Sequence, residues 1–220
     1  MSDERSCWSE VTQIMAADEI RLDRRTSDWF DRAPQRVLNQ SSHYKFAAKM
    51  LGQGKRVLDV GCRDGLGTWI LAAECGYAVG VDPDEIAISI AQSNWTDPRV
   101  AFVRGEMAEL PPGPWDGVVC LDVLSQLSPA AAQRFLSRVC QGLAHDGMAI
   151  VGAPHVASQQ YVPDVAEQET ANAYSGERLE AEMHRHFRHV FMFGAYDEVV
   201  QPGFSPRFSD LFAVGCRKLS

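Results

Sequence analysis

The stretch that decides the fold reads Val57-Leu58-Asp59-Val60-Gly61-Cys62-Arg63-Asp64-Gly65. A short run of strand character ends at Gly61, and a second glycine follows before a helical run begins. A strand that ends at a glycine lets the backbone approach a bound molecule closely. The stretch therefore predicts the strand, turn and helix that open an α/β fold, with a binding site at the turn.

The next strand supports this reading. It reads Ala78-Val79-Gly80-Val81-Asp82, and its acid stands 21 positions after Gly61. An acid about 20 residues beyond such a turn, at the end of the following strand, reaches the hydroxyls of a ribose. Since the carboxyl ends of parallel strands lie on one rim of a sheet, Gly61 and Asp82 are expected to share a nucleoside site.

Outward from these two strands the chain alternates between strands and helices. Apolar strands such as 118–121 are typical of a parallel sheet that is covered on both faces, so the fold class is α/β. The expected strands are 57–60, 78–82, 100–104, 117–121, 148–152, 190–194 and 211–216. The expected helices span parts of 10–50 with a break at Pro34, then the run through Trp69 to Ala72, 85–94, 129–143 and 176–186.

Composition narrows the function classes. The 220 residues suit one domain, expected to span 1–220, and a net charge of −8 argues against nucleic acid as a partner. The first ten residues lack the layout of a secretory signal and no apolar run reaches the roughly 20 residues of a membrane span, so a cytoplasmic protein without membrane insertion is expected. The six cysteines are scattered, and this spacing argues against both a disulfide framework and a structural metal site.

The two strand motifs resemble the class I S-adenosylmethionine-dependent methyltransferases, whose first motif reads D/E-x-G-x-G-x-G after a strand. The resemblance covers about residues 43 to 217. It implies a doubly wound, seven-stranded, mostly parallel sheet with an antiparallel last strand, and S-adenosylmethionine as cofactor. It also implies cofactor-binding roles for the residues of the two strand ends: the methionine end at Asp59, Gly61, Cys62 and Gly65, and the ribose diol at Asp82 with Pro83 beside it.

Two further segments resemble this family at the cofactor. Tyr44 follows His43 in a segment similar to the H-x-x-R-Y lead into the first strand, where such residues cover the cofactor. The segment from Gly105 to Pro111 resembles G-D-A-x-x-L-P, so Glu106 is expected to accept the adenine amino group and Met107 to meet the ring.

The fourth strand and its turn resemble the family's F-D-x-V-x-x-x-E-V-L-E-H-L segment. This similarity implies that Leu121, Asp122 and Gln126 lie beside the sulfonium and the accepting atom. Gln126 stands where a histidine is usual, and an amide cannot act as a general base. His155, just past the fifth strand, is the best-placed titratable candidate for catalysis, with a purely structural imidazole as the alternative.

One residue departs from the family pattern. Arg63 occupies the position of the middle glycine, where a side chain either leans over the cofactor or points to solvent. We expect Arg63 to be compatible with cofactor binding.

Other functions were weighed against methyl transfer. A nicotinamide-binding protein would share the turn and the acid, but the spacing of Gly61, Gly65 and Gly67 misses G-x-G-x-x-G and no Tyr-x-x-x-Lys occurs. A non-catalytic S-adenosylmethionine-binding or regulatory protein is the remaining alternative, motivated by Arg63 and Gln126.

The expected reaction is in-line displacement at the sulfonium methyl. The tail from Gly152 to His155 and beyond is similar to bacterial methyltransferases of surface-polysaccharide and small-molecule clusters, so the acceptor is expected to be a small molecule or a glycan. Residues 1–50, as a helical cap, and 155–186 are expected to cover the substrate. The sequence indicates no particular oligomeric state.

Overall fold

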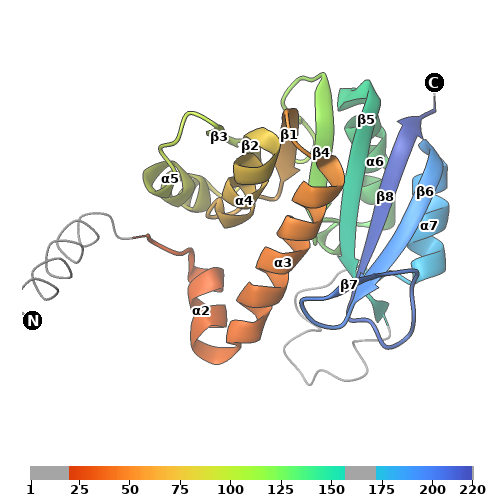
Figure 1. Ribbon diagram of the computed structural model, residues 1–220, viewed down its shortest axis with the longest axis horizontal. Coiled ribbons are helices and arrows are strands. Elements are labelled where there is room, and N and C mark those ends of the chain that lie inside the picture. The colour runs from red at the N-terminus through yellow and green to blue at the C-terminus, as the bar shows by residue number, and fades with distance from the viewer. Residues whose placement is uncertain (1–19, 157–171, 220) are drawn as a thin grey trace, which may run out of the picture.

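The computed structural model describes residues 20–156 and 172–219. They form an α/β fold in which one central sheet lies between two layers of helices (Figure 1). The strands are β1 (Lys55–Val60), β2 (Gly76–Asp82), β3 (Val100–Arg104), β4 (Trp115–Leu121), β5 (Leu143–Pro154), β6 (Phe187–Ala195), β7 (Val200–Pro202) and β8 (Asp210–Lys218). The helices are α2 (Arg24–Arg32), α3 (Pro34–Leu51), α4 (Leu66–Cys75), α5 (Glu85–Asn94), α6 (Pro129–Gly142) and α7 (Gly176–His184), with a 3₁₀ turn η1 (Leu124–Gln126).

The strand order is β3-β2-β1-β4-β5-β8-β6-β7. Strands β1 to β5 are parallel, and β8 runs antiparallel between β5 and β6. The expected α/β class and the antiparallel last strand are confirmed, as is the pairing of the two late strands. The sheet has one strand more than the seven expected, because the short β7 pairs with the end of β6. Its three residues, Val200, Gln201 and Pro202, are too few to show an alternating pattern.

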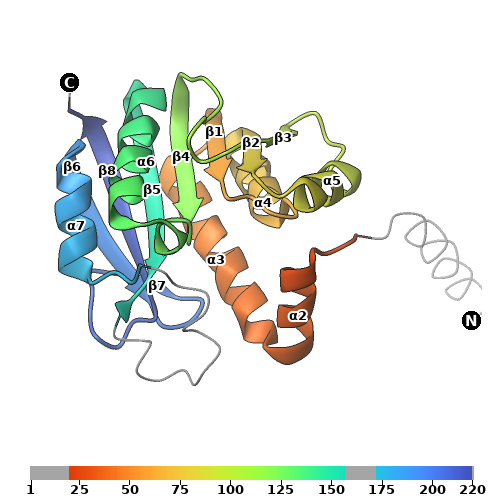
Figure 2. The same ribbon diagram turned by 180° about the vertical axis from the view of Figure 1, so that it is seen from behind.

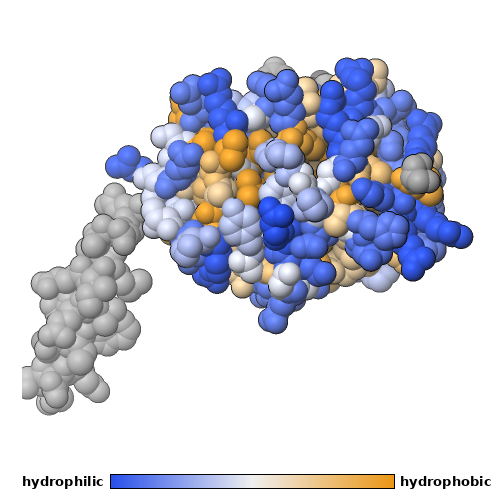
Figure 3. Space-filling view, turned by 90° about the horizontal axis from the view of Figure 1, so that it is seen from above, coloured by the Kyte–Doolittle hydropathy of each residue, from blue (hydrophilic) through white to orange (hydrophobic). Residues whose placement is uncertain are grey.

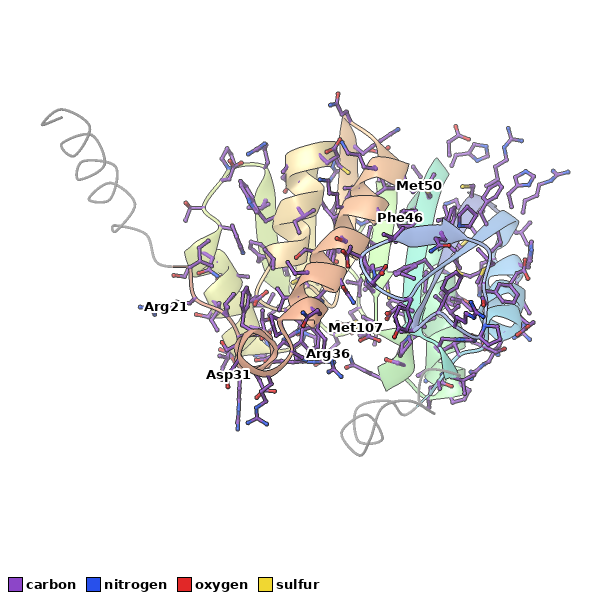
Figure 4. All side chains as sticks on the ribbon, turned by 60° about the horizontal axis from the view of Figure 1, so that its bottom comes forward. Arg21, Asp31, Arg36, Phe46, Met50 and Met107 are labelled. Atoms are coloured by element: carbon purple, nitrogen blue, oxygen red, sulfur yellow. The ribbon has the colours of Figure 1, made fainter. Side chains whose placement is uncertain are left out.

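Each face of the sheet has its own helices (Figure 2). Alternate residues of β1 point to opposite sides, so Val57 packs with α3 and α4 while Leu58 packs with α6 and α7. Phe46 of α3 rests on Phe193 and Phe212, which extends the first layer towards β6 and β8 (Figure 4). Burial on both faces explains the continuous apolar strands of the sequence.

Local signals fix where the helices begin. Asp84 caps α5 by accepting from the amides of Ile86 and Ala87, and Ser128 caps α6 just before Pro129. A side-chain oxygen at this position satisfies amides that have no partner in the helix, and proline suits the first helical turn. The helices expected over 85–94 and 129–143 therefore appear with bounds within one residue of expectation.

A close approach between α3 and α4 requires a glycine. A Cβ on Gly67 would lie 2.2 Å from the buried ring of Tyr44, whereas one on Gly142 would meet only Trp115 at 3.7 Å. We expect Gly67→Ala to lower the free energy of unfolding by about 1–3 kcal/mol through overpacking. The matched change Gly142→Ala is expected to leave it equal or raise it by up to about 1 kcal/mol. Urea denaturation compares the two variants, and equal effects would contradict the packing described here.

The two segments expected to cover the substrate are described in part. Residues 1–19 and 157–171 lie outside the described residues. The described parts, α2 with the start of α3 and the stretch around Tyr174, lie towards the carboxyl ends of the parallel strands (Figures 1 and 2). Seen from the opposite end, the surface shows apolar patches between hydrophilic side chains (Figure 3). In the described part of the chain, none of the helices has the length and apolar character needed to cross a membrane.

Candidate cofactor-binding site

The turn after β1 takes a shape that its glycines make possible. Gly61 has φ +81° and Gly65 has φ +83°, in the left-handed region that glycine adopts at no steric cost. A Cβ on Gly61 would lie 2.6 Å from Val123, and one on Gly65 would lie 2.6 Å from the ring of Phe102. The Gly61 amide donates to the carbonyl of Val81 at 2.8 Å, which joins the turn to the end of β2.

Asp82 ends β2 beside this turn. One of its carboxylate oxygens accepts the amide of Arg63 at 3.0 Å, and the other accepts the amide of Asp84 at 2.9 Å. The side chain is only 7% exposed. Burial raises the pKa of the carboxyl group, and the two amide hydrogen bonds oppose that rise. The carboxylate is thus held in one orientation at the rim, with further lone pairs on each oxygen available to accept from hydroxyl groups.

Asp59 is buried beneath the turn. Its two oxygens accept from the hydroxyls of Tyr44 at 3.1 Å and Thr68 at 2.6 Å. The ring of Tyr44 packs on Gly67. Tyr44 of α3 therefore contacts β1 through Asp59 and α4 through Gly67. Burial raises the pKa of Asp59 to about 7, while the two hydroxyl bonds lower it. The neutral acid is therefore substantially populated near neutral pH.

This raised pKa makes stability depend on pH. Because the folded pKa lies near 7 and the ordinary value is 3.8, the native state binds more protons than the unfolded state between these values. The contribution of Asp59 is thus fully present below about pH 4 and lost as the pH rises through 7. Each pH unit in that window corresponds to about 1.4 kcal/mol, so we expect a fall of a few kcal/mol.

Urea denaturation at several pH values measures this fall. Asp59→Asn is expected to unfold with a markedly flatter pH profile between pH 4 and 7, because the amide does not titrate. Asp116→Asn is the control, since this partly exposed acid of β4 accepts the Arg56 amide at the surface. A profile of Asp59→Asn that matches the wild type would refute the assignment.

A hollow lies where α3 meets the glycine turn and the start of α4. Its lining combines polar side chains of α3 with backbone of the turn: Gln40, Ser41, Tyr44, Cys62, Arg63, Asp64, Leu66, Gly67 and Ile70. The Cys62 side chain is 3% exposed, and burial raises the pKa of its thiol, so the thiol stays neutral. The turn thus brings its backbone to the edge of the hollow and presents no nucleophilic thiolate there.

The end of β3 lies beside Asp82. The amide of Gly105 donates to the Asp82 carbonyl at 3.1 Å, which places Glu106 one residue further along the rim. Glu106 is exposed and Met107 is half-buried against the core. Pro83 is half-buried, and its carbonyl accepts a hydrogen bond from the Arg104 guanidinium at 3.4 Å. The sequence-predicted adenine and ribose residues are therefore neighbours.

The end of β4 carries a second unusual backbone conformation. Asp122 has φ +70°, rare for a residue with a side chain, and its amide donates to the Gly152 carbonyl at 3.1 Å. The Ser125 hydroxyl lies 3.0 Å from the Asp122 carbonyl and 3.2 Å from its carboxylate, and Gln126 donates to the same carbonyl at 3.2 Å. Leu121, the last residue of β4, is buried. Strain of this kind persists where surrounding bonds hold it, often at functional sites.

His155 follows β5 and is 6% exposed. Its Nδ1 lies 3.1 Å from the carbonyl of Phe208, and its backbone pairs with Tyr174 and with Ser209. A ring nitrogen that faces a carbonyl must donate, so Nδ1 carries the proton and Nε2 is the basic nitrogen. This tautomer suits a base and also suits a structural imidazole.

The structure adds supporting residues that the sequence did not single out. The hydroxyl of Thr68, in the first turn of α4, holds Asp59, and the hydroxyl of Ser125, in η1, holds Asp122. The sequence signal that could have identified these two residues is a Ser or Thr in the first helical turn that follows each strand end. Arg63 directs its guanidinium to Asp23 of the cap, so neither orientation weighed for it is what the structure shows.

Comparisons with known proteins find a similar domain. The model of a family described as "Methyltransferase domain" matches residues 57–147, from β1 into β5. This matched region resembles the class I S-adenosylmethionine-dependent methyltransferases. The match contains the glycine turn, Asp82, the Glu106 segment and the Asp122 turn of this chain.

Curated relatives are bacterial. A ubiquinone biosynthesis O-methyltransferase of Xylella fastidiosa (strain M23) is 28% identical over 154 residues, covering 60% of this chain and 62% of the relative. One of Pseudomonas aeruginosa (strain LESB58) is 30% identical over 99 residues, covering 43% and 41%. The chain therefore spans less than two thirds of the length of these relatives.

Solved structures share the fold of this chain. An S-adenosylmethionine-dependent methyltransferase of Thermotoga maritima, described as a possible histamine N-methyltransferase, matches 88% of this chain and 95% of its own with TM-score 0.68 and 18% identity. The N-methyltransferase NodS of Bradyrhizobium japonicum, solved with S-adenosyl-L-homocysteine, matches 86% and 87% with TM-score 0.61 and 19% identity.

Proposed function

We propose that this protein transfers the methyl group of S-adenosylmethionine to a hydroxyl group of a small organic acceptor. The observation that carries the proposal is Asp82, whose carboxylate is fixed by two backbone amides beside a turn with two left-handed glycines. A carboxylate held in this way receives a ribose diol without reorganisation, while the glycines let the ligand approach the backbone.

The residues of the rim suit this cofactor. The sulfonium of S-adenosylmethionine supplies an activated methyl group, so the protein's main task is to align acceptor and methyl for in-line displacement. In this proposal Asp82 holds the ribose, Glu106 and Met107 meet the adenine, and the turn around Gly61 receives the methionine end. Asp122 and Gln126 then lie near the point of transfer.

His155 is the proposed acid/base or acceptor-orienting group. Its Nδ1 lies 3.1 Å from the Phe208 carbonyl, which fixes the orientation of the ring at the end of β5. A base is useful when the acceptor is a hydroxyl, since deprotonation makes the oxygen a better nucleophile.

The relatives support an oxygen acceptor. The two curated relatives, of Xylella fastidiosa and Pseudomonas aeruginosa, are named as O-methyltransferases of ubiquinone biosynthesis. Their names favour a small-molecule hydroxyl over a glycan as the acceptor. The non-catalytic alternative was motivated by Arg63 and Gln126, and the Arg63 side chain is engaged with the cap, which leaves Gln126 as its motive. The cytoplasmic location stays a prediction.

Transfer of radiolabelled methyl from S-adenosylmethionine tests the proposal. The full chain is incubated with separate panels of phenols, sugars and amines, and labelled products are counted. Label on a phenol or another small hydroxyl compound is expected. Label on sugars alone would replace the acceptor by a glycan, and cofactor binding without any transfer would favour the non-catalytic alternative.

A further inference from the structure

We propose that Arg63, in the place of the motif's middle glycine, fastens helix α2 across the glycine turn and so slows the exchange of bound cofactor. The inference rests on the proposed function, because it concerns how S-adenosylmethionine is retained. Arg63 acts here as a positioning residue through α2.

The guanidinium of Arg63 is engaged on three sides by the start of α2. Its Nη2 lies 2.5 Å from a carboxylate oxygen of Asp23 and 3.3 Å from the hydroxyl of Thr26. Its centre lies 5.1 Å from the ring of Trp29, at cation–π distance. Asp23 is itself the N-cap of α2, accepting the Thr26 amide at 2.6 Å. The contact therefore holds the first turn of the helix.

The stretch that leads into α2 has a second anchor on the other side of the turn. The side chain of Asn94, at the end of α5, accepts from the amide of Arg21 at 3.0 Å and donates to its carbonyl at 2.6 Å. The Asp23 amide also donates to Asp64 of the turn at 3.3 Å. Figure 4 shows Arg21 on the side of α5 and Arg36 at the start of α3, with α2 between them. Residues 21–26 thus form a strap from α5 to the glycine turn.

The ion pair between Arg63 and Asp23 is largely buried, so it can stabilise the contact between the turn and α2. The side chains of Arg63 and Asp23 are 17% and 11% exposed. When one partner of such a pair is removed, the other is left as an uncompensated charge away from water, which is strongly unfavourable. Loss of either charge is therefore expected to release the start of α2 from the turn.

Main chain and side chain of Arg63 have separate tasks. The amide orients Asp82, while the guanidinium holds the strap. Arg63→Met keeps an amide and a long side chain at φ +53° and removes only the charge and its hydrogen bonds. Asp23→Asn keeps an oxygen that caps α2 and removes the charge. The two variants test the strap while leaving the bond from the Arg63 amide to Asp82 in place.

Stopped-flow kinetics of S-adenosylhomocysteine with the full chain distinguishes a strap from a cofactor ligand. A ligand that enters beneath a released strap associates and dissociates faster, whereas loss of a direct contact accelerates dissociation alone. In Arg63→Met and Asp23→Asn we expect dissociation at least tenfold faster and association at least threefold faster. The double variant is expected to match the single ones, since one pair is broken in each.

Arg32→Met is the control, since this arginine of α2 pairs only with Asp28 in an exposed i,i+4 contact within the described residues. It is expected to keep wild-type rates. Trypsin cleavage after Arg24 and Arg25, without cofactor, gives an independent reading and should be at least tenfold faster in Arg63→Met than in Arg32→Met. Unchanged association and cleavage would overturn the strap, whereas wild-type protein that binds no S-adenosylhomocysteine would overturn the proposed function.

Discussion

Replacing Asp82 with alanine is expected to weaken the binding of S-adenosylmethionine at least tenfold and to leave the fold intact. A charge-assisted hydrogen bond is worth about 1.5–3 kcal/mol, and 1.4 kcal/mol corresponds to a factor of ten in affinity. If both ribose hydroxyls donate to the carboxylate, the loss exceeds a hundredfold. Calorimetry with the cofactor measures it directly.

Asp97→Ala is the control for this change. Asp97 is an acid in the turn before β3, paired with Arg99 at the opposite end of that strand from Glu106. Its removal changes the net charge equally and is expected to leave cofactor affinity unchanged. Circular dichroism confirms that each variant is folded. A folded Asp82→Ala protein with wild-type affinity would contradict the assignment of the ribose site.

His155→Ala is expected to lower turnover by about 10² to 10⁴, the usual worth of general acid–base assistance. The affinity for S-adenosylmethionine should stay nearly unchanged, because the imidazole acts on the acceptor in this account. The measurement is the rate of methyl transfer at saturating cofactor, once the acceptor panel has given a substrate.

Two further variants separate catalysis from structure. His155→Asn keeps a donor for the Phe208 carbonyl and removes the base, so it is expected to be as slow as His155→Ala. Near wild-type turnover in His155→Asn would show that the imidazole serves only to hold that carbonyl. His145→Ala changes an exposed histidine at the other end of β5 and is expected to have no effect.

Much of the parallel half of the fold was predictable from the sequence. Strands buried on both faces leave continuous apolar runs, and polar caps such as Asp84 and Ser128 mark the helix starts. The glycine turn was also predictable, because glycines after a strand mark a place where the backbone approaches a ligand. Both Gly61 and Gly65 adopt left-handed backbone in the structure. Asp82 followed from its place at the end of β2.

The remaining features depend on contacts between distant segments. The three residues of β7 become a strand only because β6 lies beside them. The role of Arg63 depends on Asp23, which stands 40 positions earlier in the chain and meets it only after α2 folds back onto the turn. The hydrogen bond from Tyr44 to Asp59 beneath the turn likewise requires the packing of α3 on α4. No local pattern encodes these pairings.

Isothermal titration calorimetry of the full chain with S-adenosylhomocysteine tests the central claim most directly. We expect one site per chain, filled in the micromolar range, and a loss of at least tenfold in affinity in Asp82→Ala but not in Asp97→Ala. Absence of binding below the millimolar range in the folded wild-type protein would contradict both the cofactor site and the methyl transfer proposed from it.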